Sequence, residues 1–121
     1  MRSRIIAVSY LNTIPFIYGI EHADVTLHAD LILSPPRNCA VALRAGEADI
    51  ALIPVAAIPT IPDIRIITPY CIGASNSVRT VVLASNSPIS ELHTIYLDSD
   101  FMTSVGFVRI LSSRWCHITP E

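Results

Sequence analysis

The chain has 121 residues, of which 51% are hydrophobic and 15% are charged, and its formal net charge at pH 7 is −2. This composition excludes a disordered chain, because disorder goes with high charge and few apolar residues. All eight basic residues are arginines scattered singly, which excludes a catalytic lysine and predicts no basic face for nucleic acid.

The N-terminal part of the chain is expected to form a strand, a short helix and a second strand. Residues 4–9 are almost continuously apolar, which is typical of a strand covered on both faces of its sheet. A turn over 10–14 leads to a short helix over 15–18, where proline suits the first position and Gly19 suits the end. Residues 25–33 alternate between apolar and polar side chains, which predicts the next strand.

The clearest local signal is the helix that follows. Ser34 can cap it through its hydroxyl, two prolines suit its first turn, and residues 39–43 continue it. Gly46 can adopt the left-handed conformation that ends a helix. Glu47 and Asp49 come after this end and are interpreted as solvated turn residues.

Short strands are expected in the rest of the chain. Their β-branched and apolar content places them over residues 49–53, 64–68, 78–84 and 93–98. A loop or broken helix is predicted over 54–63, and a short turn or helix over 88–92. The last expected element is a helix over 103–115, whose apolar face would carry Val105, Val108, Leu111 and Trp115. Strands that alternate with helices predict an α/β fold with a mostly parallel sheet flanked by helices.

Cysteine spacing and hydropathy indicate the redox state of the thiols and whether a membrane span is expected. The widely spaced Cys39, Cys71 and Cys116 do not make a disulfide framework, so we expect buried free thiols in a reducing cytoplasm. The most apolar later stretch, residues 50–61, is shorter than the roughly 20 residues of a transmembrane helix and contains prolines. No membrane span is therefore expected.

Two polar segments are candidates for a ligand site. Ligands of parallel sheets sit beyond the carboxyl ends of strands, which here means the loops that begin at Ser9, Pro54 and Asp98. The amide of Asn12 could exchange hydrogen bonds with a ligand hydroxyl, or it could merely shape the turn. Thr103 and Ser104 open a helix whose N–H groups could bind a carboxylate, the alternative being ordinary N-capping.

The residue spacing does not match that of known calcium or zinc sites. Residues 98–109 begin like a calcium loop, but Thr103 stands at the glycine position and Arg109 at the glutamate position. Cys116 and His117 have no second pair at zinc spacing. No metal and no cofactor are expected.

Several short stretches carry a family resemblance. They are VSYLNTIPF at 8–16, LRAGEADIALIPVAAIP at 43–59, YCIGA at 70–74, and TIYLD at 94–98 with TSV at 103–105. In this order they resemble the chorismate dehydratase family of the futalosine route to menaquinone. The resemblance implies a fold like the type 2 periplasmic binding proteins, in which two α/β lobes close on a ligand. Residues 1–82 would form the first lobe and 83–121 the start of an incomplete second lobe, because family members look about twice as long.

The resemblance also implies a function. A cytoplasmic lyase of this family dehydrates chorismate to 3-[(1-carboxyvinyl)oxy]benzoate without a cofactor. Asn12 would be the active-site amide that contacts the departing hydroxyl or holds the reacting carboxylate, and Thr80 would stand in for the family's active-site serine. Ser9, Thr103 and Ser104 would bind the substrate.

Two other functions stay open at this point. One is a non-catalytic protein on the same scaffold that binds a small carboxylate, and the other is an inactive fragment without a complete cleft. Two copies of the chain could also complement each other by pairing exposed strand edges. The expected partners are therefore chorismate and a second copy in a homodimer, with neither nucleic acid nor membrane.

Overall fold

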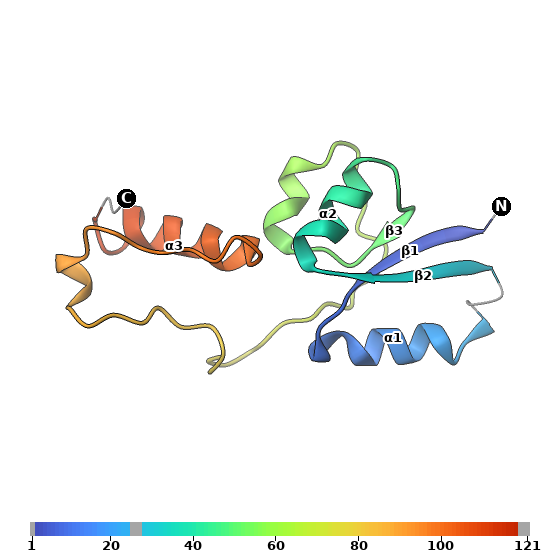
Figure 1. The fold of residues 1–121 in the computed structure, drawn as a ribbon, viewed down its shortest axis with the longest axis horizontal. Helices are drawn as coiled ribbons and strands as arrows, with labels where there is room; N and C mark the ends of the chain where they lie inside the picture. Colours follow the sequence, from blue (N-terminus) through green and yellow to red (C-terminus); the bar gives the residue numbers. More distant parts are fainter. Residues whose placement is uncertain (1, 25–27, 119–121) are drawn as a thin grey trace. The chain divides into compact units, whose positions relative to one another are not determined.

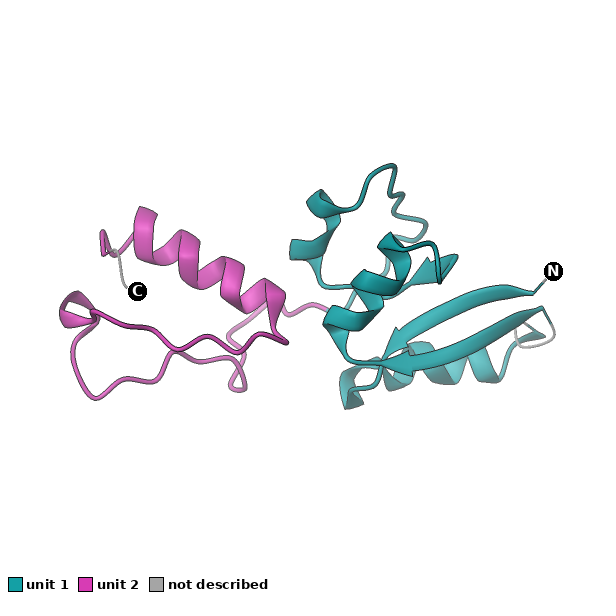
Figure 2. Cartoon of the chain, turned by 45° about the horizontal axis from the view of Figure 1, so that its top comes forward, with its two compact units in different colours: residues 1–72 teal, residues 73–121 magenta. Residues whose placement is uncertain are grey.

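The computed structural model describes residues 2–24 and 28–118. The chain divides into two compact units, residues 1–72 and 73–121 (Figure 2). The lobe boundary expected between residues 82 and 83 stays a prediction, because compactness within this chain does not define the lobes of a binding protein.

The first unit is built on a three-stranded parallel sheet with the order β2-β1-β3. Its strands are β1 (Ser3–Val8), β2 (Ala29–Ser34) and β3 (Ile50–Ala51). The register pairs Ser3 with Ala29 along one edge of β1 and Ile5 with Ile50 along the other. The nearly continuous apolar sequence of β1 fits its central place, since its last four residues are all buried. The predicted first strand is confirmed, and the part of the second prediction at 25–27 lies outside the described residues.

Helices α1 (Ile14–Glu21) and α2 (Pro36–Arg44) lie on opposite faces of this sheet (Figure 1). The chain crosses from β1 to β2 along one face and returns past β1 to β3 along the other. Parallel strands need such crossovers, and these crossovers are right-handed. The chain adds β2 on one side of β1 and β3 on the other, so the two crossovers lie on opposite faces of the sheet. The carboxyl ends of β1 and β3 are therefore neighbours at the point where the winding reverses.

Helix α1 is longer than predicted. Gly19 does not end it, because the backbone N–H of His22 donates to the carbonyl of Tyr18 at 3.0 Å and carries the helix past the glycine. The imidazole of His22 stacks on the ring of Tyr18 with centroids 3.8 Å apart, and its Nδ1 lies 2.9 Å from the same carbonyl. These contacts satisfy the helix end in place of a glycine.

Helix α2 confirms most of its predicted signals. Pro36 occupies the first turn, and Gly46 after the end has a φ of 71°, in the left-handed region that glycine adopts freely. The expected cap by the Ser34 hydroxyl is wrong. Ser34 is the last residue of β2, and its carbonyl accepts hydrogen bonds from the Ser9 N–H at 3.1 Å and the Cys39 thiol at 3.5 Å.

The hydrophobic core of the first unit lies between α2 and the sheet. Its central buried cluster consists of Ile6, Val8, Cys39 and Ala48, with partly buried Ala42, Ala51, Leu52 and Ile53 packed against it. The expectation of buried thiols is right for Cys39 and wrong for Cys71, which is exposed, while Cys116 is half-buried. Burial raises the pKa of the Cys39 thiol, so this sulfur is inert packing material.

The segment after β3 is helical where a loop or broken helix was predicted. A 3-10 helix, η3 (Val55–Thr60), carries Pro59 inside it and buries Ala57. The strand expected over 49–53 is formed only at Ile50–Ala51, and the strand expected over 64–68 is absent. Both segments are apolar enough for strands, but a strand also needs a neighbour along its whole length.

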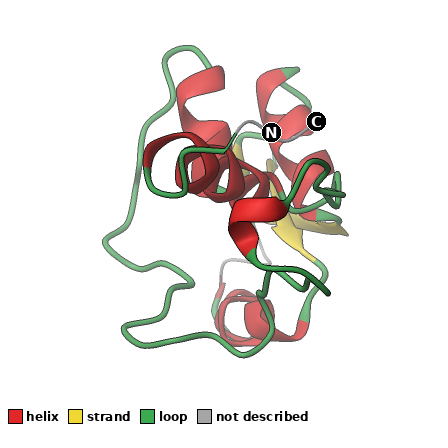
Figure 3. Ribbon diagram, turned by 90° about the vertical axis from the view of Figure 1, so that its left-hand side faces the viewer, coloured by secondary structure: helices red, strands yellow, loops and turns green. Residues whose placement is uncertain are grey.

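In its described part, residues 73–118, the second unit has two helical elements, η4 (Ile89–Glu91) and α3 (Met102–Arg114). The predicted strands over 78–84 and 93–98 are wrong, since both segments are irregular backbone (Figure 3). Helix α3 is confirmed to within one residue at each end. Its expected apolar face is covered only in its first half, because Leu111 is 48% exposed and Trp115 81% exposed.

The predicted α/β class is confirmed as a mixture of helices with a small parallel sheet. The finer assignment, a fold like the type 2 periplasmic binding proteins, stays a prediction.

Candidate functional site

The carboxyl ends of β1 and β3 carry the first group of candidate residues. The two strands are hydrogen-bonded neighbours and run in the same direction, so the loops from Ser9 and Pro54 leave the sheet at the same edge. These are two of the three places where a ligand site was expected. The third expectation, a loop after a strand ending at Asp98, is wrong because no strand precedes it.

Ser9 and Asn12 both present exposed side chains beyond β1. The backbone N–H of Ser9 extends the pairing of β1 with β2 by one bond, to the Ser34 carbonyl. Asn12 lies in a short 3-10 helix, η1 (Leu11–Thr13), and its amide makes no hydrogen bond to any residue that the structure describes. The turn-shaping alternative for Asn12 required such a bond, so the geometry favours an amide available to a ligand.

Thr13 is a feature that sequence reasoning missed. The residue is fully buried, and its Oγ1 has no hydrogen-bond partner among the described residues. Its backbone N–H donates to the Tyr10 carbonyl at 3.0 Å, which closes the turn after β1. An unpaired buried hydroxyl costs about 1–3 kcal/mol. The local sequence does not indicate that Thr13 is buried and Asn12 exposed, because burial depends on the tertiary structure.

The second group of candidates lies on a cavity of about 300 Å³ within the second unit. Thr80 and Ser104 both line it, although they are far apart in sequence. Thr80 is exposed and Ser104 is half-buried. Most of the remaining wall is apolar and comes from Val81, Val82, Leu83, Ile95, Tyr96, Leu97, Phe101, Val105 and Val108. This hollow is open to solvent, since Val82 on its wall is 73% exposed and Tyr96 95% exposed, and it presents two hydroxyls on an apolar surface.

The start of α3 shapes one side of this cavity. The helix begins at Met102, so Thr103 and Ser104 lie inside its first turn, and no side chain caps it. The N-capping alternative for these two residues is therefore wrong, and their hydroxyls are not used at the cap. Thr103 is half-buried beside Ser104 but does not line the cavity.

Asp98 adds a carboxylate to the same cavity. Its Oδ1 accepts the backbone N–H of Asp100 at 3.0 Å, and its carbonyl accepts the N–H of Phe101 at 3.2 Å. These bonds fix the turn that leads into α3. The sequence places Asp98 at the end of an expected strand, in a family motif and at the start of the rejected calcium loop, but not among the candidate binding residues. Its negative charge on the cavity wall opposes the binding of an anion at close range.

The first unit has a separate cavity of about 350 Å³ beside the sheet, with Arg4, Asn38 and Glu47 on its wall. None of the predicted site residues lines it. Ser9 and Asn12 belong to the first unit and Thr80, Thr103 and Ser104 to the second. The structure thus brings Thr80 together with Ser104, and it keeps Ser9 near Asn12 on the loop after β1.

The strongest electrostatic feature of the first unit is the pair of Arg4 and Asp49. The Arg4 guanidinium donates to both carboxylate oxygens, at 2.8 Å and 3.1 Å, and the Arg4 backbone N–H donates to Oδ2 at 2.8 Å. These hydrogen bonds lower the pKa of Asp49 to about 2. Asp49 is exposed, as expected of a solvated residue after the helix end, but it is also held by Arg4. It ties β1 to the turn before β3, and its N–H also donates to the Arg4 carbonyl at 2.9 Å.

Two further observations concern the described part of the chain. No three His, Cys, Asp or Glu side chains gather there in the way that a metal ion requires. None of its helices has both the length and the apolar character needed to cross a bilayer.

Comparison with known proteins identifies the family. A family model described as menaquinone biosynthesis matches residues 3–121, which is almost the whole chain. The chain belongs to this family, and the recognition based on the sequence motifs is confirmed. Neither the curated proteins nor the solved structures contain a match to the chain. Membership indicates a biosynthetic enzyme with a role in making menaquinone.

Proposed function

We propose that the chain is a chorismate dehydratase, a lyase that eliminates water from chorismate on the route to menaquinone. Family membership supports the pathway. The observation that carries the reaction is the cavity of the second unit, on which Thr80 and Ser104 lie together. These are two of the residues that the resemblance assigns to the reacting substrate.

The chemistry asks little of the side chains beyond orientation. One ring C–H bond and the neighbouring C–OH bond of chorismate break, a C=C bond forms, and the ring becomes aromatic. The products are water and 3-[(1-carboxyvinyl)oxy]benzoate, so the reaction is redox-neutral. Because aromatisation drives the elimination, a protein accelerates it mainly by holding the dianion in a reactive geometry and excluding water.

In this proposal each polar group has a defined role. The Asn12 amide donates to the departing hydroxyl or holds the reacting carboxylate, for which its lack of other described partners makes it suitable. The hydroxyls of Thr80 and Ser104 donate to the substrate. The first turn of α3, with Thr103, adds backbone N–H groups and the positive end of the helix dipole to a bound carboxylate. Ser9 contributes its exposed hydroxyl beyond β1.

The proposal is tested by incubating the 121-residue chain with chorismate and analysing the product by mass spectrometry. We expect a product lighter by one water that retains the carboxyvinyl ether. Binding of chorismate without turnover would replace the lyase by a small-carboxylate binding protein. If the chain neither binds nor converts chorismate, both functions are contradicted and the chain is an inactive fragment.

A further inference from the structure

Strand β2 is an open edge of the sheet in the first unit. The order β2-β1-β3 gives β2 a single neighbour, β1. The Ser3 N–H donates to the His28 carbonyl at 3.0 Å, and in a parallel ladder every second residue bonds to the same neighbouring strand. The even-numbered residues of β2 therefore carry the bonds to β1. The backbone N–H and C=O groups of Leu31 and Leu33 alternate with them and point away from β1.

The outward backbone groups of Leu31 and Leu33 have no hydrogen-bond partner in residues 2–24 and 28–118. At the start of the strand, by contrast, the Ala29 carbonyl accepts a hydrogen bond from the Arg2 guanidinium at 2.8 Å. Proteins commonly protect an edge with a lysine, a proline or a bulge, and residues 31–34 (LILS) contain none of these. The middle of β2 is therefore suited to pair with a further strand.

Apolar side chains are exposed on both faces of this edge. Ile32 is 52% exposed and its neighbour Leu33, which points to the opposite face, is 50% exposed. Helix α2 packs mainly against β1 and β3, so it does not cover Ile32. Between α2 and β2 lies the cavity of about 350 Å³, on whose wall Ile32 is joined by Val41, which is 57% exposed. A strand added to β2 would cover these side chains.

We propose that two copies of the chain pair antiparallel along β2, with a two-fold axis at Ile32. This register sets Leu31 opposite Leu33 of the second copy, and the two residues exchange N–H···O=C bonds. All four outward groups of each edge are then satisfied. The two Ile32 side chains meet at the axis, on the face that carries the cavity.

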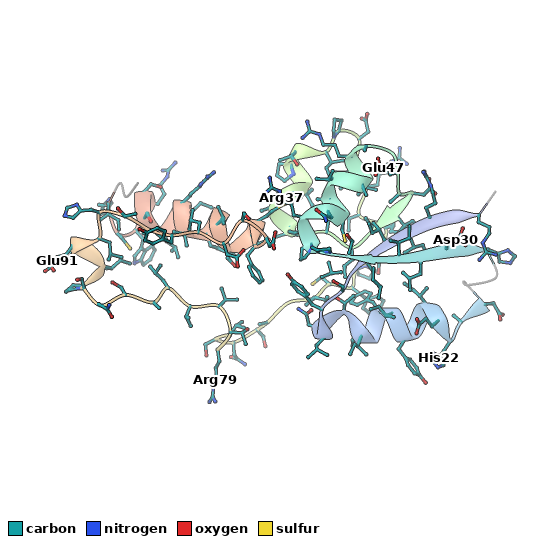
Figure 4. All side chains as sticks on the ribbon, in the orientation of Figure 1. His22, Asp30, Arg37, Glu47, Arg79 and Glu91 are labelled. Atoms are coloured by element: carbon teal, nitrogen blue, oxygen red, sulfur yellow. The ribbon has the colours of Figure 1, made fainter. Side chains whose placement is uncertain are left out.

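The charges around β2 suit a second copy in this orientation. Asp30 lies opposite Ser34 of the second copy, so no like charges face each other in the ladder. Figure 4 shows Arg37 at the start of α2 and Glu47 beyond the other end of this helix. An antiparallel copy brings the Arg37 end of one chain towards the Glu47 end of the other. Opposite charges therefore approach each other on both sides of the axis.

The other edge of the sheet limits the assembly to two copies. Strand β3 (Ile50–Ala51) is only two residues long, which is too short to direct the pairing of a further strand. Each copy thus has one edge suited to pairing, and a two-fold axis uses both of these edges at once. An unrelated strand would meet the same backbone groups but would not bring the second Ile32 or the complementary charges.

The test begins with sedimentation equilibrium of the full chain over a range of concentrations, in which we expect a species of twice 13.2 kDa. Ile32→Lys places two ammonium groups together at the axis and should weaken the dimer about tenfold or more. Ile110→Lys is the matched control, because Ile110 in α3 is 59% exposed against 52% for Ile32. This control should keep the dimer, and circular dichroism checks that both variants fold.

Hydrogen exchange tests the register without a substitution. The amides of Leu31 and Leu33 should exchange slowly in the dimer and rapidly when dilution dissociates it. The Ile32 amide is the internal control, because it bonds to β1 and should exchange slowly in both states. A monomer at every concentration, or an open series of larger species, would overturn this pairing. A dimer in which Leu31 and Leu33 exchange rapidly, or which Ile32→Lys leaves intact, would overturn it equally.

Discussion

Neighbouring residues on the loop after β1 have opposite surroundings. Asn12 is exposed with an amide that meets no described partner, whereas Thr13 is fully buried with an unpaired hydroxyl. Removal of an exposed carboxamide changes the free energy of folding little, so the role of Asn12 can be tested without unfolding the chain. A buried hydroxyl without a partner is a cost to the folded state. The two positions therefore separate function from stability within one turn.

Asn12→Ala should abolish most turnover of chorismate and leave the fold intact. Removal of one hydrogen-bond donor at a reacting group typically lowers kcat by about 100-fold or more. The measurement is steady-state kinetics together with a thermal melt, in which the melting temperature should stay unchanged. Asn38→Ala, at an exposed asparagine of α2, is the matched control and should retain activity. Full activity in Asn12→Ala would remove Asn12 from the proposed mechanism.

Thr13→Val should leave the free energy of unfolding unchanged or raise it by about 1 kcal/mol, because it keeps the shape and removes the unpaired hydroxyl. Thr13→Ser keeps the hydroxyl and loses the buried methyl group, so it should destabilise by about 1 kcal/mol. Urea unfolding of both variants measures the difference. A valine variant less stable than the serine variant would mean that the hydroxyl has a partner in solution, such as a buried water.

Asp49 predicts a specific pH dependence of stability. Its pKa is about 2 in the folded chain, where Arg4 donates to it, and about 3.9 in an unfolded chain. The unfolded state therefore binds a proton at a higher pH, so the stabilisation by Asp49 is complete above about pH 4 and is lost as the pH falls towards 2. Plotted against pH, the melting temperature should therefore fall on the acid side, and we call this fall the acid limb. Asp49→Asn should make the acid limb shallower in thermal melts recorded from pH 6 to 2.

Arg4→Gln gives the control for the Asp49 prediction, because it removes the cause of the low pKa and keeps the carboxylate. It should flatten the same limb, and the double variant should add little to either single one. An acid limb that stays steep in Asp49→Asn would place the responsible carboxylate elsewhere.

At the scale of elements, local signals predicted helices better than strands. Pro36 and Gly46 mark α2, and α3 was predicted to within one residue at each end. Helices are stabilised by bonds within one segment, so their signals are local. The strands expected over 64–68, 78–84 and 93–98 have the right composition but no pairing partner. Strand pairing is a long-range property, and among residues 2–24 and 28–118 only β1, β2 and β3 obtain it.

Asp98→Asn tests the cavity at the start of α3. Asparagine can still accept the N–H of Asp100, so the turn is kept and only the charge is removed. If this cavity holds a substrate carboxylate, the Michaelis constant for chorismate should fall a few-fold, because a like charge has gone. Asp100→Asn, at a residue that does not line the cavity, should have a smaller effect. An unchanged or higher constant would place the substrate carboxylates away from Asp98.

At the scale of the whole molecule, the two units differ in how much apolar surface they bury. The first unit has a core between α2 and the sheet, whereas the second has no buried apolar side chain among its described residues. The high hydrophobic content of the sequence is thus not evenly used.

The sequence by itself determined the α/β class, the first strand, the helices near 36–44 and 102–114, the left-handed glycine and the family. These follow from periodicity, proline and glycine positions, and short motifs, all of which act over a few residues. Only the tertiary structure decided that Thr80 and Ser104 share a cavity, that Thr13 is buried, and that Asp49 clamps β1. The reason is that cavities, burial and strand pairing join residues far apart in the chain.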